Sequence, residues 1–211
     1  MKLPRLLTGL FIGSQILLLL SACTSPAIKK QAGVNLNWSK QQLALNTIQQ
    51  WRINGRIAVQ TKDDGGQADF VWQLENLSTY EIRLQAPLGA GTTWINSEPQ
   101  GASIKTSSGD ALYDTDVDAL ILRMNGWRLP VNGLRYWVRG LPSPGSDYEI
   151  TEWNDNGLPA VVIQDGWRIE FRKHQNVSGQ FLPSKLFINR VNMEEEVDVR
   201  LIIRQWVIDS V

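Results

Sequence analysis

Few side chains in this sequence could carry out acid–base, nucleophilic or metal chemistry. His174 is the only histidine and Cys23 the only cysteine among 211 residues. A Ser-His-Asp triad would depend on this one imidazole, and a zinc site with several Cys and His ligands is excluded. Asp114, Asp116 and Asp118 could serve a hydrolase, but they stand at the expected start of a helix, where the helix dipole favours acidic side chains. We therefore expect no catalytic residue, no metal site and no cofactor, and predict that the protein is not an enzyme.

Cys23 ends an N-terminal segment with the layout of a secretory signal. Lys2 and Arg5 precede an apolar run from Leu10 to Leu20, and small residues follow. The sequence Leu-Ser-Ala-Cys at positions 20–23 resembles the bacterial lipobox, in which a diacylglycerol is attached to the Cys thiol and cleavage makes that Cys the amino terminus. We expect residues 1–22 to be a lipoprotein signal peptide and Cys23 to be lipidated. Thr24 follows instead of the Asp that retains enterobacterial lipoproteins in the inner membrane, which implies an anchor at the periplasmic face of the outer membrane.

The composition of the chain describes a neutral protein rich in tryptophan. Lys and Arg number 21, as do Asp and Glu, so no net charge attracts the chain to nucleic acid. The chain has nine tryptophans, as many as its four tyrosines and five phenylalanines together. Tryptophan provides a large, rigid apolar surface. We expect these rings to line or cover something wide and apolar.

Most of the chain after a short leading helix has the alternating pattern of β-strands. Leu43, Thr47, Ile48 and Trp51 recur at helical spacing after a plausible N-cap at Ser39. From Trp51 the period becomes two, which is typical of a strand with one buried face. Such strands are predicted over 51–60, 67–75, 80–86, 92–96, 148–153, 159–164, 167–171, around 186–188, and 197–204.

Two short helices are predicted in the middle of the sequence. Thr115 and Asp118 have the spacing of a capping box, and a glycine at 126 ends the apolar face that follows. That face consists of Val117, Leu120, Ile121 and Met124. The second helix is predicted over 132–139, with Gly140 at its end. About ten strands and these inserts predict a mainly β single domain, a curved antiparallel sheet that is either open or closed into a barrel, with helices on its concave side. We expect residues 23–38 to be a lipidated tether and residues 39–211 to be this domain.

The loop Pro87-Leu88-Gly89-Ala90-Gly91 joins two predicted strands and should lie on the surface. A leucine between proline and glycine has few neighbours with which to bury itself. The sequence leaves two alternatives open. Leu88 either folds back onto the rim of the core or projects from the loop for a functional reason.

Several motifs along the chain resemble those of the outer-membrane lipoprotein receptor family LolB. They are GRIAV at 55–59, APLGA at 86–90, GWRLPVNGLRYWVRGLPSP at 126–144, GW at 166–167, LPSKL at 182–186 and a closing strand at 200–206. The resemblance implies an unclosed antiparallel barrel of eleven strands, similar in fold to the periplasmic carrier LolA, with helices capping a hydrophobic cavity. It also implies that the protein takes cargo lipoproteins from LolA, holds their acyl chains, and inserts them into the outer membrane. By this resemblance Leu88 is the protruding residue implicated in membrane insertion.

The resemblance gives the aromatic and helical residues a candidate role in lining or covering the cavity. These candidates are Trp51, Trp72, Trp94, Leu120, Ile121, Met124, Trp127, Trp137 and Trp167. We expect at least half of the tryptophans among them to be ordinary core, and we expect the protein to be a monomer. The alternative function is a structural envelope lipoprotein with a filled interior that binds an assembly partner through an aromatic surface.

Overall fold

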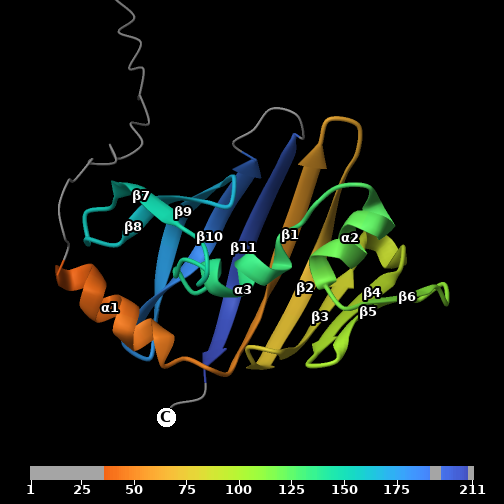
Figure 1. Cartoon of the computed structure of the whole chain (residues 1–211), viewed down its shortest axis with the longest axis horizontal. Coiled ribbons are helices and arrows are strands. Elements are labelled where there is room, and N and C mark those ends of the chain that lie inside the picture. The colour runs from red at the N-terminus through yellow and green to blue at the C-terminus, as the bar shows by residue number, and fades with distance from the viewer. Residues whose placement is uncertain (1–35, 191–195, 209–211) are drawn as a thin grey trace, which may run out of the picture.

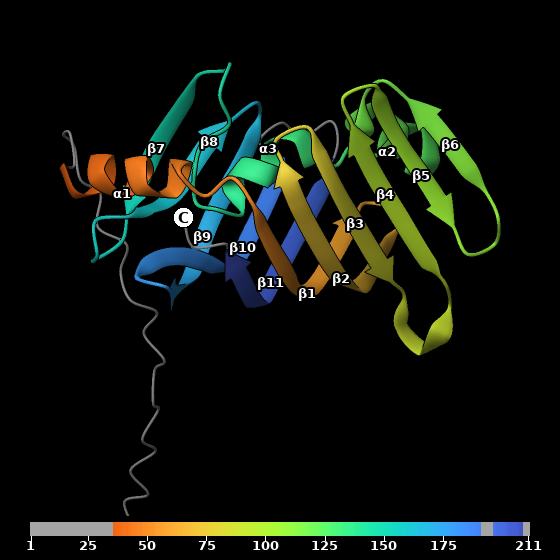
Figure 2. The ribbon, with the colours of Figure 1, turned by 90° about the horizontal axis from the view of Figure 1, so that it is seen from below.

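The computed structural model describes residues 36–190 and 196–208, which form one open antiparallel sheet with helices on its concave side (Figure 1). In the described residues the sheet has eleven strands in the order β6-β5-β4-β3-β2-β1-β11-β10-β9-β8-β7. The edge strands β6 and β7 do not pair with each other, so the barrel is unclosed. Figure 2 shows the sheet curving around α2 and α3. The predicted mainly β, unclosed fold is confirmed.

The strands follow the alternating pattern of the sequence closely. Their bounds are β1 (Trp51–Thr61), β2 (Gly65–Asn76), β3 (Thr79–Gln85), β4 (Thr92–Glu98), β5 (Gly101–Thr106), β6 (Ala111–Asp114), β7 (Tyr148–Trp153), β8 (Pro159–Gln164), β9 (Trp167–Val177), β10 (Gln180–Arg190) and β11 (Val197–Ile208). Strands β5 and β6 were not predicted, although Ala102 and Ile104 alternate with polar residues and are buried. They are short, and the second carries only one partly buried apolar residue, Leu112.

The leading helix α1 (Leu36–Asn46) differs from its prediction in start and orientation. It begins before Ser39, and Trp38 is buried in edge-to-face contact with Trp153 of β7, with the ring centroids 6.4 Å apart. Leu43, expected on the buried face, is 71% exposed, whereas Leu45 is buried. The packing of Trp38 decides this orientation, because one large ring buries more apolar area than a leucine. Residues 36–38, which were expected in the tether, thus belong to the described helix.

The other helices lie close to their predicted places. Helix α2 (Val117–Asn125) ends at Gly126, which has the left-handed conformation expected of a helix C-cap (φ +78°). Its N-cap is Asp116, not Thr115, since the Asp116 carboxylate accepts a hydrogen bond from the Ala119 backbone N–H at 2.9 Å. Helix α3 (Val131–Trp137) precedes Gly140, as predicted. No helix among the described residues is long and apolar enough to span a membrane.

Candidate functional site

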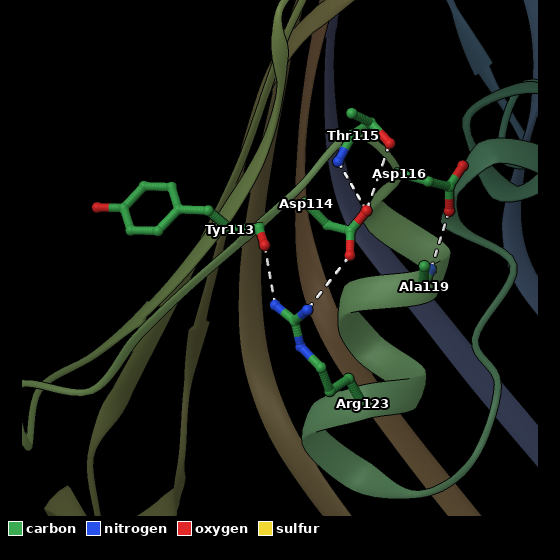
Figure 3. A network of polar contacts seen from close by, with 6 residues as sticks. All are labelled: Tyr113, Asp114, Thr115, Asp116, Ala119 and Arg123. Carbon is green, nitrogen blue, oxygen red and sulfur yellow. Dashed lines mark hydrogen bonds and ion pairs between the residues drawn. The ribbon is translucent and has the colours of Figure 1, made fainter.

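Helix α2 is fastened to the edge of the sheet by polar contacts (Figure 3). Arg123, in its last turn, donates from Nη1 to the Asp114 carboxylate at 3.3 Å and from Nη2 to the backbone carbonyl of Tyr113 at 2.8 Å. Both residues belong to β6. The Arg123 side chain is half exposed, so these contacts fix the position of the helix more than they stabilise the fold.

The start of α2 is also joined to the start of α3. The Asp118 carboxylate accepts a hydrogen bond from the backbone N–H of Asn132 at 3.2 Å, and the Asp116 carboxylate accepts one from the Asn132 side-chain amide at 3.0 Å. Burial raises the pKa of Asp118 to about 6, and the nearby Asp116 charge adds to this, while the backbone N–H groups of α3 oppose it. The two helices thus form one cover over the concave face, linked through a carboxyl group that titrates near neutral pH.

An apolar pocket lies between this cover and the sheet. It has a volume of about 250 Å³. On the sheet side its apolar lining residues are Ile57, Val59, Ala68, Leu84, Ile95 and Ile104, and on the helix side they are Ile121, Met124, Trp127 and Leu129. The β1–β2 hairpin, with Asp64 and Gly65, forms part of its rim. The pocket can hold an apolar group. Asp64 is the one carboxylate among its lining residues, so the pocket offers no pair of carboxylates for acid–base chemistry.

Leu88 projects into solvent beside this pocket. Its side chain is fully exposed (107%), and its backbone has φ +56° and ψ 24°, a left-handed conformation that is strained for a leucine. The loop is tied at its base, where the Ala86 N–H donates to the Gly91 carbonyl at 3.0 Å. Leu84 and Thr93, just before and after the loop, both line the pocket. A strained, fully exposed leucine costs stability without burying surface, so packing does not explain its place in this loop.

Three of the predicted cavity and lid candidates line the pocket. These are Ile121, Met124 and Trp127. Leu120 is fully buried on the adjacent face of α2 and belongs to the core, as do Trp51, Trp72, Trp137 and Trp167. Trp51 packs at ring-centroid distances of 5.2 Å from Trp72 and 5.6 Å from Trp206. These rings support the sheet and the cover from within.

Trp94 is the candidate whose predicted cavity role is wrong. It is only partly buried, and its neighbours Thr93 and Ile95 are the residues of β4 that line the pocket. Because side chains alternate across a strand, Trp94 must lie on the outer face of the sheet. The number of tryptophans in the sequence could not show on which face of the sheet Trp94 lies, because the pairing register of β4 sets that.

The prediction also missed the aliphatic lining that the sheet contributes. Ile57, Val59 and Leu84 were recognised as the apolar side of their strands, but not as pocket residues. The signal that could have found them is position, because they stand at the strand ends nearest the Leu88 loop. Cys23 lies outside the described residues, so its lipidation remains a prediction. Within residues 36–190 and 196–208, no group of three His, Cys, Asp or Glu side chains could hold a metal ion.

Comparisons with known proteins agree with this architecture. The family described as Outer membrane lipoprotein LolB matches residues 49–206. The chain is 35% identical over 198 residues to "Outer-membrane lipoprotein LolB" of Alkalilimnicola ehrlichii, covering 93% of this chain and 96% of that protein. It is 32% identical over 200 residues to the protein of that name from Pseudomonas paraeruginosa, covering 93% and 95%.

Among solved structures, the LolA superfamily protein NE2245 of Nitrosomonas europaea is similar in fold. Its TM-score is 0.53 at 8% identity, covering 85% of this chain and 96% of that one. A putative outer membrane lipoprotein-sorting protein domain from Vibrio parahaemolyticus has a TM-score of 0.50 at 7% identity, covering 83% and 92%. These likenesses concern the fold alone, whereas the sequence matches span most of the chain. The chain belongs to the outer membrane lipoprotein LolB family.

Proposed function

We propose that this protein is a lipid-anchored receptor at the periplasmic face of the outer membrane, which accepts lipoproteins from a periplasmic carrier of the LolA kind and inserts their acyl chains into that membrane. The observation that carries this proposal is the exposed Leu88 beside an apolar pocket. Membership of the LolB family and the similarity of the fold to a LolA superfamily protein support it.

The energetics of acyl chains explain why such a receptor needs a pocket. Exposing one methylene to water costs about 0.8 kcal/mol, so three chains of about fifteen methylenes cost on the order of 35 kcal/mol. A lipoprotein must therefore pass from one apolar host to another. The pocket under α2 supplies the apolar wall, and Leu88 supplies an apolar group that can enter the bilayer first.

The pocket must enlarge to accept a lipid. Its volume of about 250 Å³ is below the roughly 300–1,000 Å³ of sites that enclose drug-sized ligands. The wall formed by α2 and residues 126–130 is the one that can move, because no strand pairing holds it to the sheet. Its attachments are the buried apolar side chains of α2 and the polar contacts of Arg123 with β6 and of Asp118 with α3. Gly126, with its left-handed backbone, is placed to act as the hinge. The structural-lipoprotein alternative requires a filled interior, and the pocket does not support it.

A transfer experiment tests the proposal. A radiolabelled lipoprotein bound to its purified carrier is mixed with the chain from residue 23 onward carrying Cys23→Ala, and delivery to phospholipid vesicles is then measured. Leu88→Glu should still accept cargo and fail to deliver it, because moving a charged side chain into the bilayer has a high free-energy cost. Leu43→Glu is the matched control, since Leu43 is also exposed but lies on α1.

Two results would contradict the proposal. If the folded protein takes no cargo from the carrier, the receptor function is wrong and a structural role gains support. If Leu88→Glu and Leu43→Glu deliver equally well, the pocket can still receive cargo, but the loop has no part in insertion.

A further inference from the structure

Trp94 stands in a row of outward side chains that the cavity does not explain. In the antiparallel register, Arg83 of β3 lies opposite Trp94 of β4, and Trp94 lies opposite Lys105 of β5. Directly paired side chains on one face of a sheet have Cβ atoms about 5 Å apart. Tyr113 of β6 lies opposite Ser103, two residues farther from the loop than Lys105. It is 64% exposed, and its ring points away from α2 (Figure 3). We call Arg83, Trp94, Lys105 and Tyr113 the Trp94 patch.

The patch places positive charge at one end of this outer face. Arg83 and Lys105 are exposed, and within the described parts of the chain neither forms an ion pair. On β3 and β4 the acidic side chains of this face, Glu81 and Glu98, stand farther along their strands from the Leu88 loop. Asp69 of β2 lies opposite Gln85 at the base of the loop, and it is paired with two cations, Arg56 and Arg204. Asp110, in the adjacent β5–β6 turn, accepts a hydrogen bond from the Ser108 hydroxyl at 2.8 Å. On β3 to β5 the outward charges nearest the loop are therefore Arg83 and Lys105, with Glu81 and Glu98 beyond them.

The distance of the patch from the loop matches the layering of a bilayer surface. Thr92 pairs with Gln85 at the base of the loop, and the row of Trp94 is two residues farther down the strands, or about 7 Å. If Leu88 reaches the acyl chains, the Trp94 row lies at the level of the headgroups. Tryptophan and tyrosine concentrate at this level, and Lys and Arg are attracted to the phosphates of anionic lipids.

Because the Trp94 patch lies next to the exposed Leu88, we propose that the patch binds anionic phospholipid headgroups and orients the receptor with Leu88 toward the bilayer. The proposal rests on the membrane role of Leu88 in the proposed function and adds a headgroup-binding surface to it. A lipid surface fits better than an acidic protein because Trp94 stands between two cationic side chains beside an apolar tip. With Arg83 and Lys105 nearest the loop, Glu81 and Glu98 of the same strands would lie farther from an anionic surface.

Binding to vesicles tests the patch. The chain from residue 23 with Cys23→Ala is titrated with vesicles of phosphatidylethanolamine and phosphatidylglycerol, and with vesicles in which phosphatidylcholine replaces the anionic lipid. The double variant Arg83→Gln/Lys105→Gln should bind the anionic vesicles on the order of 10- to 30-fold more weakly, and added salt should reduce this difference. The matched control is Lys40→Gln/Arg52→Gln, which removes the same charges from α1 and from the far end of β1, where both side chains are exposed. Trp94→Ala should weaken binding to both kinds of vesicle, with thermal unfolding measured to confirm that the variant is folded.

A fluorescent label reports the orientation independently. Since Cys23 is the only cysteine, the Cys23→Ala chain accepts a single new one, at Gln85 beside the loop or at Gln73 on the same outer face of β2. An environment-sensitive dye should shift to the blue on vesicle binding at position 85 and remain unchanged at 73. Equal losses for the two double variants, no loss for either, or equal dye shifts would overturn the patch. Failure of cargo uptake from the carrier would instead contradict the receptor function, whatever the vesicle result.

Discussion

The indole N–H of Trp137 donates a hydrogen bond to the side-chain carbonyl of Gln164 at 2.9 Å, which joins the end of α3 to β8. The same oxygen accepts from the Ser143 backbone N–H at 2.8 Å, and the Gln164 amide donates to the Ser143 carbonyl at 2.7 Å. Gln164 is 1% exposed. One buried amide thus satisfies the groups that hold α3 and the following loop against the sheet.

Gln164→Leu should lower the free energy of unfolding by about 3 kcal/mol. The leucine keeps the volume but leaves the Trp137 N–H and the Ser143 N–H buried without acceptors, and each orphaned group costs about 1–3 kcal/mol. Urea unfolding followed by circular dichroism measures the change. Gln73→Leu, on an exposed position of β2, should change stability by less than about 0.5 kcal/mol. Equal effects of the two changes would contradict the assigned role of the buried amide.

Gly55→Ala should destabilise the protein by more than about 3 kcal/mol. A Cβ at this position would lie 1.9 Å from the backbone carbonyl oxygen of Ile202, where the register of β1 and β11 shifts. The backbone of a central strand cannot move away without breaking its ladder. Gly66→Ala is the control, because no atom lies within 4 Å of the added Cβ. The melting temperatures of both variants measure the difference. A Gly55→Ala protein as stable as the parent would contradict the close approach of β1 and β11 at this position.

Asp118 should make the protein less stable as pH rises from about 4 to about 6. Its pKa in the folded protein is about 6, raised mainly by burial from an ordinary value near 3.8. The folded state therefore binds the proton more tightly than the unfolded state. The resulting contribution to the free energy of unfolding is fully present below about pH 4 and is lost above about pH 6. Asp118→Asn should remove about 1–2 kcal/mol of this pH dependence. The comparison uses unfolding at both pH values, with the exposed Asp63→Asn as the control. An unchanged pH profile in Asp118→Asn would mean that other groups cause it.

Leu88→Gly should stabilise the protein while impairing delivery. Replacing leucine in a left-handed backbone conformation stabilises the protein by about 1–2 kcal/mol, and the greater freedom of glycine in the unfolded chain offsets about half of this. The expected net stabilisation is about 0.5–1 kcal/mol. Ala90→Gly, where φ is −66°, should instead destabilise, because no strain is relieved. Thermal unfolding gives the two signs, and vesicle delivery gives the functional loss. A destabilised Leu88→Gly protein would contradict the strained loop.

Ala68→Phe should reduce acceptance of cargo. Ala68 lines the pocket, so the added ring would occupy part of its volume of about 250 Å³. Ala58→Phe is the control, since Ala58 lies on the adjacent strand but on the outer face, opposite Gln67 and Arg200. Uptake of labelled lipoprotein from the carrier is measured for both, together with their thermal stability. If Ala68→Phe and Ala58→Phe take up equal amounts of lipoprotein, the acyl chains do not bind in this pocket.

The alternation of residues predicted much of the fold because the period of a strand is a local property. Nine strands are predicted in this way, whereas helical spacing and capping residues predict the two middle helices. Gly126 is the C-cap of α2, but α3 ends at Trp137, three residues before Gly140. Strands β5 and β6 escaped because short segments with few apolar residues give little periodic signal. The N-cap moved from Thr115 to Asp116 because two neighbouring residues can both cap a helix, and the geometry of the turn selects one.

For the candidate site, the residue pattern predicts the loop that carries Leu88 and the apolar face of α2. The three-dimensional packing shows that Leu88 is strained and fully exposed, that Asp118 meets the start of α3, and that Trp94 faces outward. It also decided that β6 and β7 stay apart, which leaves the sheet open. The physical reason is that each of these features depends on strand register or on curvature summed over many strands. Both are set by contacts between residues far apart in the chain, whereas side-chain alternation is set by neighbouring residues.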